Sequence, residues 1–248
     1  MTSSTAWIKA CLNGSRRPAD HPALPLTAAA LAADAAAAVA AGAVAVHIHP
    51  RDDAGAQTMD PAHVDAAVRA VRAAQPGLPV GVTTGAWIEP DPARRVALAS
   101  RWRERPDFAS VNFSEQGAAE LARALLERGV GVEAGLWSAD DARTLLASGL
   151  QERCVRFLVE PRDREPAAAL ATGEAILALL EGAGATPPRL LHGGGPAAWA
   201  VLREALRRGL QTRIGLEDTL DLPDGARAAG NADLVRAAFA IAAEVAAG

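Results

Sequence analysis

The feature that most constrains the fold is a regular alternation of two kinds of segment. Short apolar runs rich in Val, Ile and Leu each precede a longer stretch of Ala, Leu and Arg at helical spacing. Such alternation is typical of βα units that build a parallel sheet. We expect eight strands, at residues 7–12, 43–49, 80–84, 108–113, 130–134, 154–159, 189–192 and 212–216.

Each predicted strand is followed by a predicted helix, with Thr27 and Ser138 as expected N-caps and Pro61 at a first helical position. Eight such pairs in 248 residues match an α/β fold of the (β/α)8 TIM barrel type. A doubly wound dinucleotide-binding sheet is disfavoured, because no Gly-x-Gly-x-x-Gly follows the first strand. We predict one domain over residues 1–248. The helices are expected at residues 28–41, 61–74, 92–103, 118–127, 139–147, 166–180, 196–208 and 232–246.

The composition is that of an ordinary globular protein, with 50% hydrophobic and 22% charged residues. A net charge of −4 gives no reason to expect nucleic acid or an anionic membrane as a partner. Cys11 and Cys154 lie in apolar runs, which predicts buried thiols in a reducing compartment, and no signal pattern opens the chain. We therefore expect a cytoplasmic protein. The alanine-rich helix at 28–41 would pack closely on a second copy, so a homo-oligomer, dimer or tetramer, is expected.

The predicted second strand ends on His47-Ile48-His49. Side chains at i and i+2 leave the same face of a strand, so both imidazoles project together. Neutral imidazole is a common ligand of zinc and similar ions. Two histidines that merely bond to backbone and water are the alternative interpretation.

Other polar side chains gather where the predicted strands end, which is the rim that carries the chemistry of a barrel. Glu217 follows the last strand and could complete a metal site with His47 and His49, because the side chains of a closed barrel converge over its axis. Two nitrogens and a carboxylate suit a catalytic zinc that would polarise a carbonyl and stabilise an enolate. Asp218 is expected in the loop, as a base or as an orienter of Arg213 or a histidine. The remaining rim candidates are Asn13, Thr83, Thr84, Asn112, Glu115, Glu133, Glu160 and His192.

Several candidates have a structural alternative. Glu217 could be a charge at a helix N-terminus, and Glu133 could pair with an arginine inside the barrel. His192 could be an ordinary core histidine, and the glycines at 193–195 could cradle a phosphate or merely form a turn. We expect Trp87 and Trp137 to wall a pocket, Trp102 and Trp199 to pack helices, and His21 and His63 to lie on the surface.

With these features assembled, the sequence resembles the β-keto acid cleavage enzymes, the family typified by 3-keto-5-aminohexanoate cleavage enzyme. The resemblance covers most of the chain, and the pairing of its second and last motifs is specific. The motifs are Ala10-Cys11-Leu12-Asn13-Gly14, Val46-His47-Ile48-His49-Pro50-Arg51-Asp52, Thr83-Thr84-Gly85 and Thr212-Arg213-Ile214-Gly215-Leu216-Glu217-Asp218.

The resemblance implies a barrel that holds one divalent metal, usually zinc, through His47, His49 and Glu217. The family reaction joins a β-keto acid with acetyl-CoA and yields acetoacetate and an acyl-CoA. Asp218 matches the base and Arg213 the arginine that assists it. Thr83 and Thr84 match the region that contacts the substrate carboxylate, and Asn13, Asn112, Glu133 and His192 are further substrate-binding candidates on the rim.

The loop after the first strand bears on the substrate. Family members that act on amino-substituted substrates carry an acidic residue there, whereas this chain reads Asn13-Gly14-Ser15-Arg16, which favours a neutral or anionic side group. Two other functions are compatible with the same rim. One is a metal-dependent aldolase or hydrolase that uses no CoA, and the other is a non-catalytic metal-binding or metabolite-binding barrel.

Overall fold

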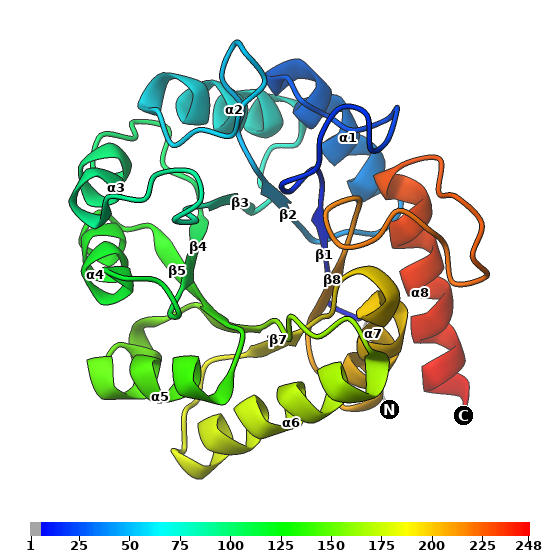
Figure 1. The fold of residues 1–248 in the computed structure, drawn as a ribbon. Helices are drawn as coiled ribbons and strands as arrows, with labels where there is room; N and C mark the ends of the chain where they lie inside the picture. Colours follow the sequence, from blue (N-terminus) through cyan, green and yellow to red (C-terminus); the bar gives the residue numbers. More distant parts are fainter. Residues whose placement is uncertain (1–5) are drawn as a thin grey trace.

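The computed structural model describes residues 6–248, which form a ring of parallel strands inside a ring of helices (Figure 1). The expected (β/α)8 TIM barrel is thus confirmed. The strands are β1 (Ile8–Cys11), β2 (Ala45–Ile48), β3 (Val80–Thr83), β4 (Phe108–Asn112), β5 (Gly131–Leu136), β6 (Arg156–Val159), β7 (Arg189–Leu191) and β8 (Thr212–Ile214).

The helices follow the strands in strict alternation, and the expected caps form. The Thr27 side chain accepts a hydrogen bond from the Ala30 amide, and Ser138 forms a reciprocal capping box with Asp141. The helices are α1 (Ala28–Ala40), α2 (Pro61–Ala74), α3 (Pro92–Ala99), α4 (Ala118–Glu127), α5 (Ala139–Ser148), α6 (Pro166–Gly182), α7 (Ala198–Arg207) and α8 (Asn231–Ala247), with short 3-10 turns η1 (Gln151–Arg153) and η2 (Gly195–Ala197).

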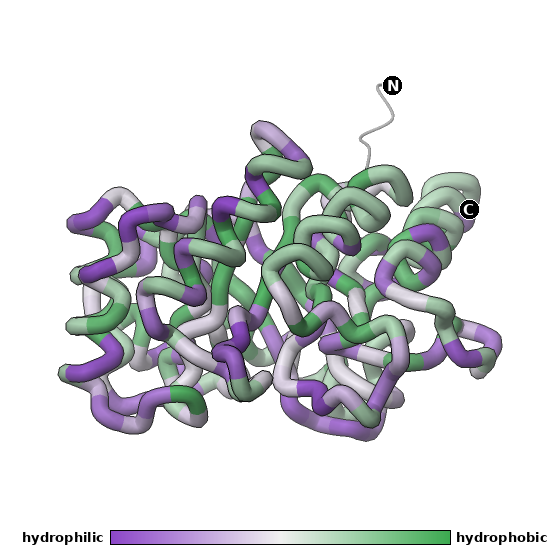
Figure 2. Tube along the Cα trace, turned by 90° about the horizontal axis from the view of Figure 1, so that it is seen from above, coloured by the Kyte–Doolittle hydropathy of each residue, from purple (hydrophilic) through white to green (hydrophobic). Residues whose placement is uncertain are grey.

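The ring closes through β1, which pairs with β2 on one side and β8 on the other. Between β7 and β8 the contact narrows to a bridge of Leu190 with Gln211, supported by a bond from the Thr212 hydroxyl to the Leu191 carbonyl. Figure 2, which shows the molecule from above relative to Figure 1, has hydrophobic stretches through the middle of the molecule and many hydrophilic stretches at its periphery. Between residues 6 and 248, no helix has the length and apolar character needed to cross a bilayer.

The interior of the barrel holds a buried charge cluster of Lys9, Glu133 and Arg156. Lys9, the only lysine in the sequence, places Nζ 2.6 Å from both Glu133 carboxylate oxygens, and Arg156 Nη1 lies 2.6 Å from one of them. Burial alone would raise the pKa of Glu133, but Lys9 and Arg156 outweigh it and hold that pKa below its usual range. Glu133 is therefore an anion that neutralises two cations from β1 and β6.

Asp34 of α1 is a half-buried carboxyl that should make stability depend on pH. Burial raises its pKa to about 6, and the hydrogen bond from the Asn231 side chain offsets this only in part. Because the folded state then binds more protons than the unfolded chain between about pH 4 and 6, stability falls as pH rises through that window. We expect Asp34→Asn to stabilise the protein at pH 7 by on the order of 1–3 kcal/mol and to change little near pH 3.5.

Urea denaturation at the two pH values would measure this difference. Asp140→Asn, at an exposed position on α5, is the matched control and should change stability by less than about 0.5 kcal/mol at either pH. An equal effect of Asp34→Asn at both pH values would contradict the assignment.

Candidate metal centre

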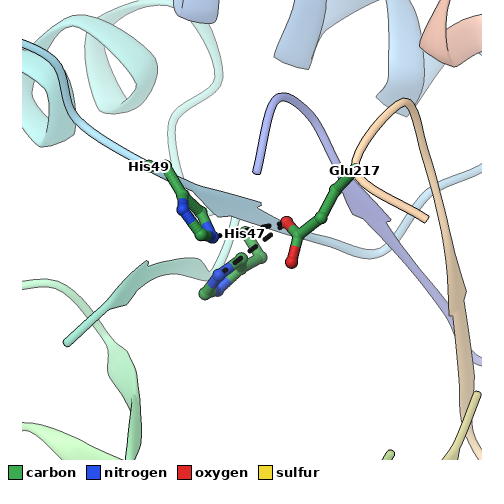
Figure 3. A group of neighbouring side chains, drawn as sticks. All are labelled: His47, His49 and Glu217. Carbon is green, nitrogen blue, oxygen red and sulfur yellow. Dashed lines mark ion pairs between the residues drawn. The ribbon is translucent and has the colours of Figure 1, made fainter. Parts of the chain in front are cut away.

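Two histidines and one glutamate meet at the carboxyl ends of β2 and β8 (Figure 3). Glu217 Oε2 lies 3.5 Å from His49 Nε2 and 4.0 Å from His47 Nε2. All three side chains face a cavity of about 760 Å³ that opens at this rim. The predicted convergence of residues about 170 positions apart in the sequence is what the closed barrel produces.

A tight turn after β8 brings Glu217 over the end of β1. A Cβ atom on Gly215 would lie 2.0 Å from the Cys11 carbonyl oxygen, so only glycine permits this close approach of the two backbones. The turn is fixed from α8, where the buried Asn231 side chain accepts from the Leu216 amide at 2.7 Å and donates to the Leu12 carbonyl at 2.8 Å. The expected eighth strand therefore ends early, at Ile214, and Glu217 belongs to the turn rather than to the strand or a helix N-terminus.

The three side chains fit a divalent metal. Glu217 Oε2 is buried and makes no hydrogen bond, which leaves an anionic oxygen aimed at the two imidazoles. Burial lowers the pKa of His47 to about 3 despite the nearby Glu217, so the ring is neutral and its nitrogen lone pair is available at neutral pH. One ligand atom from each residue lies within 4.8 Å of the others. Such a His-His-carboxylate set leaves coordination positions open for a substrate.

Arg213 of β8 holds the two carboxylates that follow it. Its Nη2 donates to Glu217 Oε1 at 2.9 Å and to Asp218 Oδ1 at 2.7 Å, and its Nε also reaches Asp218 Oδ1 at 3.1 Å. Burial raises the pKa of Asp218 above its usual range, although Arg213 and His192 oppose this. The other oxygen of this carboxylate, Asp218 Oδ2, is buried and has no hydrogen-bond partner, so it is free to accept a proton.

His192 lies beside this pair just beyond the end of β7. Its Nδ1 accepts from Arg213 Nε at 3.1 Å, which leaves the ring proton on Nε2, 3.4 Å from Glu160 Oε2. Burial would raise the pKa of Glu160, but His192 and the nearby arginines bring it down to about 2. His192 thus connects Glu160 to Arg213, and both histidine and glutamate line the cavity.

Three predicted substrate-binding residues lie outside the cavity lining. The Asn13 side chain bridges the Pro25 and His49 backbones. Alternation along β3 turns Thr84 outward to the Ser110 carbonyl, while Thr83 faces the cavity.

Glu133 was expected at a strand end, but β5 continues to Leu136, so Glu133 lies deeper, in the charge cluster. The alternative of an arginine partner for Glu133 is the correct one. Asn112 does line the cavity, with its amide bound to Glu115.

Some of the predicted positions of the tryptophans and histidines are confirmed, and others are wrong. Trp87 and Trp137 line the cavity as expected, but so does Trp199, which was assigned to helix packing. Trp102 is fully buried in the core, as predicted. His21 is not a surface residue: it is 2% exposed and bonds to the Ala228 carbonyl, whereas His63 of α2 is half-buried.

The glycine run before α7 bonds through one of its amides to the loop after β8. The Gly195 amide donates to the Asp218 carbonyl at 2.7 Å, and the Ala197 amide donates to the Gly194 carbonyl. The run therefore ties the η2 turn to the loop that carries Asp218.

Gln57 is a site residue that the sequence did not indicate. Its Oε1 lies 2.6 Å from His49 Nδ1 and 3.2 Å from the Trp87 indole nitrogen. It stands in the loop between β2 and α2, where no periodic pattern marks which way a side chain points. A glutamine after a short turn carries no recognisable signal of such a role.

A family model described as beta-keto acid cleavage enzyme matches residues 5–247. The chain belongs to the β-keto acid cleavage enzyme family. No curated protein matches this chain.

Solved structures share its fold at low identity. One is the binary complex of ObcA with oxaloacetate, at 17% identity and a TM-score of 0.67, with 87% of this chain and 62% of that chain covered. Another is the ternary complex of ObcA with a C4-CoA adduct and oxalate, at 17% identity and a TM-score of 0.66, with the same two coverages. A further match is 3-dehydroquinate dehydratase from Geobacillus kaustophilus HTA426, at 14% identity and a TM-score of 0.60, with 97% of this chain and 92% of that chain covered. The chain therefore covers less than two thirds of the length of each of these ObcA chains.

Proposed function

We propose that this protein is a zinc-dependent enzyme that converts a β-keto acid and acetyl-CoA into acetoacetate and an acyl-CoA. The observation that carries the proposal is the meeting of His47, His49 and Glu217 in one cavity with the Arg213–Asp218 pair. Membership of the family and the ObcA complexes with oxaloacetate and a C4-CoA adduct support the same substrate classes.

The metal would be held by His47, His49 and Glu217. When bound, it would polarise the oxygens of the β-keto acid and so stabilise the negative charge that develops there. The cavity wall beside these ligands carries the Thr83 hydroxyl and the Asn112 amide, which are suited to donate to a carboxylate or keto oxygen, whereas the Ser110 hydroxyl donates to Glu133.

Asp218 is the proposed base, through its unbonded Oδ2. The most acidic C–H of a β-keto acid lies between its two carbonyl carbons, and removal of that proton prepares the carbon to attack the acetyl thioester and expel the CoA thiolate. The thiolate would then attack the ketone carbon, and cleavage of the bond between that carbon and the α-carbon would give the acyl-CoA and the acetoacetate carbanion. Asp218 would hold the proton and return it to that carbanion. Arg213 keeps the carboxylate in place through Oδ1 and, being cationic, stabilises the ionised form before each turnover.

The mouth of the cavity suits a CoA ester. Four arginines line it, and Arg162 lies 4.6 Å over the Trp137 ring. Positive charges at the rim favour the phosphates of CoA, and the indoles of Trp137 and Trp199 give its pantetheine arm an apolar wall. The arginines at the mouth are Arg16, Arg162, Arg164 and Arg227, and the fifth lining arginine is Arg213.

The test is a panel of β-keto acids with neutral and anionic side groups, incubated with the zinc-loaded protein and scored for acetoacetate. We expect release only when acetyl-CoA is present, and loss of release in Asp218→Asn with zinc still bound, because the amide cannot accept the proton. Turnover without acetyl-CoA would indicate an aldolase or hydrolase instead. Zinc binding with no product from any acid would favour a non-catalytic barrel.

A further inference from the structure

Trp87, Gln57 and His49 form a hydrogen-bonded chain that links two loops to one proposed metal ligand. Gln57 Oε1 accepts from the Trp87 indole at 3.2 Å and lies 2.6 Å from His49 Nδ1. The indole also stacks beside His49, with ring centroids 6.4 Å apart and planes at 21°. Gly85 makes room for this ring, because a Cβ atom there would lie 2.3 Å from the indole.

The chemistry of the three groups fixes the direction of every bond. An indole nitrogen can only donate, so the Gln57 atom that it meets must be the carbonyl oxygen and not the amide nitrogen. A carbonyl oxygen can only accept, so the proton between Gln57 and His49 must sit on His49 Nδ1. The lone pair of the neutral ring is then on Nε2, which is the nitrogen that faces Glu217.

The backbone holds Gln57 in position for this role. Gln57 pairs with Arg51 in an isolated antiparallel bridge, and the turn between them is closed by the Ala54 and Ala56 amides, which donate to the Asp52 carboxylate. The Arg51 guanidinium in turn bonds to the Gly14 and Arg16 carbonyls. The loop is therefore anchored to β2 and to the segment after β1 before any ligand binds.

We propose that Trp87 and Gln57 are positioning residues that preset His49 as the Nδ1–H tautomer, ready to bind a metal through Nε2. Gln57 without a donor on its other side could rotate its amide and offer NH2 to His49, which would stabilise the wrong tautomer. Trp87 removes that possibility. The inference rests on the proposed metal site, but the tautomer is a property of the metal-free protein.

The first test is the ring tautomer, read from long-range ¹H–¹⁵N spectra of the histidines in the metal-free protein. We expect a His49 pattern with the proton on Nδ1, and loss of that preference in Gln57→Leu. An unchanged His49 pattern in Gln57→Leu would overturn the proposal. This outcome is independent of whether the wild-type protein binds zinc, so it separates the present inference from the proposed function.

The second test is zinc affinity, measured by competition with a chromophoric chelator. Removing the outer partner of a ligating histidine weakens metal binding about 10–100-fold, and we expect this for Gln57→Leu. Gln57→Glu should keep tight binding, because a carboxylate still accepts from His49. That rescue would separate a positioning role from general damage to the loop.

A double-mutant cycle isolates the role of Trp87. Trp87→Phe keeps an aromatic ring but loses the donor, so it should weaken zinc binding on the order of tenfold when Gln57 is present. In the Gln57→Glu background, Trp87→Phe should leave the zinc affinity unchanged, because a carboxylate has no amide that could be misoriented. Equal costs in the two backgrounds would show that Trp87 acts only by packing, and would overturn its part of the proposal.

Discussion

Replacing His47 with alanine is expected to reduce bound zinc to an undetectable level and acetoacetate formation by about 10³-fold or more. His47 supplies one of two imidazoles, and its low pKa keeps that ring neutral, as a metal ligand must be. The loss in rate corresponds to several kcal/mol of charge stabilisation that the metal would provide. Elemental analysis of the purified variant and a steady-state assay with acetyl-CoA would measure the two effects.

His63→Ala is the matched control, because His63 is a half-buried histidine on α2 outside the cavity lining. It should retain both zinc and activity. If His47→Ala kept its zinc, the ligand assignment would be wrong. If it lost zinc but turned over normally, the proposed use of the metal would be wrong.

Lys9→Met is expected to destabilise the protein by about 3–5 kcal/mol, the cost of removing one partner from a buried ion pair. Lys9 and Glu133 are both fully buried, so the carboxylate would lose one of its two cations without gaining water. The measurement is urea denaturation near neutral pH. Lys9→Met combined with Glu133→Gln should recover part of the loss, since the unpaired negative charge is then gone.

An exposed ion pair provides the comparison. Arg143→Met removes the partner of Asp140 on α5, where both side chains are largely in water, and should cost less than about 1 kcal/mol. A cost of that small size for Lys9→Met would mean that the cluster contributes little to stability. The charge cluster also contacts the cavity wall: the Ser110 hydroxyl lines the cavity and donates to Glu133 at 3.0 Å. Loss of Lys9 from the cluster should therefore also make the Ser110 side of the cavity less rigid.

The sequence by itself determined the order of the elements and one half of the candidate metal site. Alternating apolar and helical segments indicated βα units, and their number favoured a barrel over a doubly wound sheet. The two-residue period of a strand required His47 and His49 to share a face. These results depend on local geometry, which neighbouring residues in the chain control.

Only the tertiary structure decided which rim residues reach the cavity. Glu133 was misplaced because a strand pattern does not reveal where β5 ends, and three more residues of strand move a side chain from the rim into the interior. Asn13 and Thr84 lie outside the cavity lining, and their side chains bond to the backbones of His49 and Ser110, contacts between segments far apart in the sequence.

The same reason hid Gln57 and Asn231, which lie in a loop and at a helix start and act through partners from other elements. Glu217 shows the division most clearly. Its approach to the histidines depends on a glycine that fits against the β1 backbone and on an asparagine from α8. Side-chain direction after a strand ends is set by packing between distant segments, and that packing exists only once the barrel has closed.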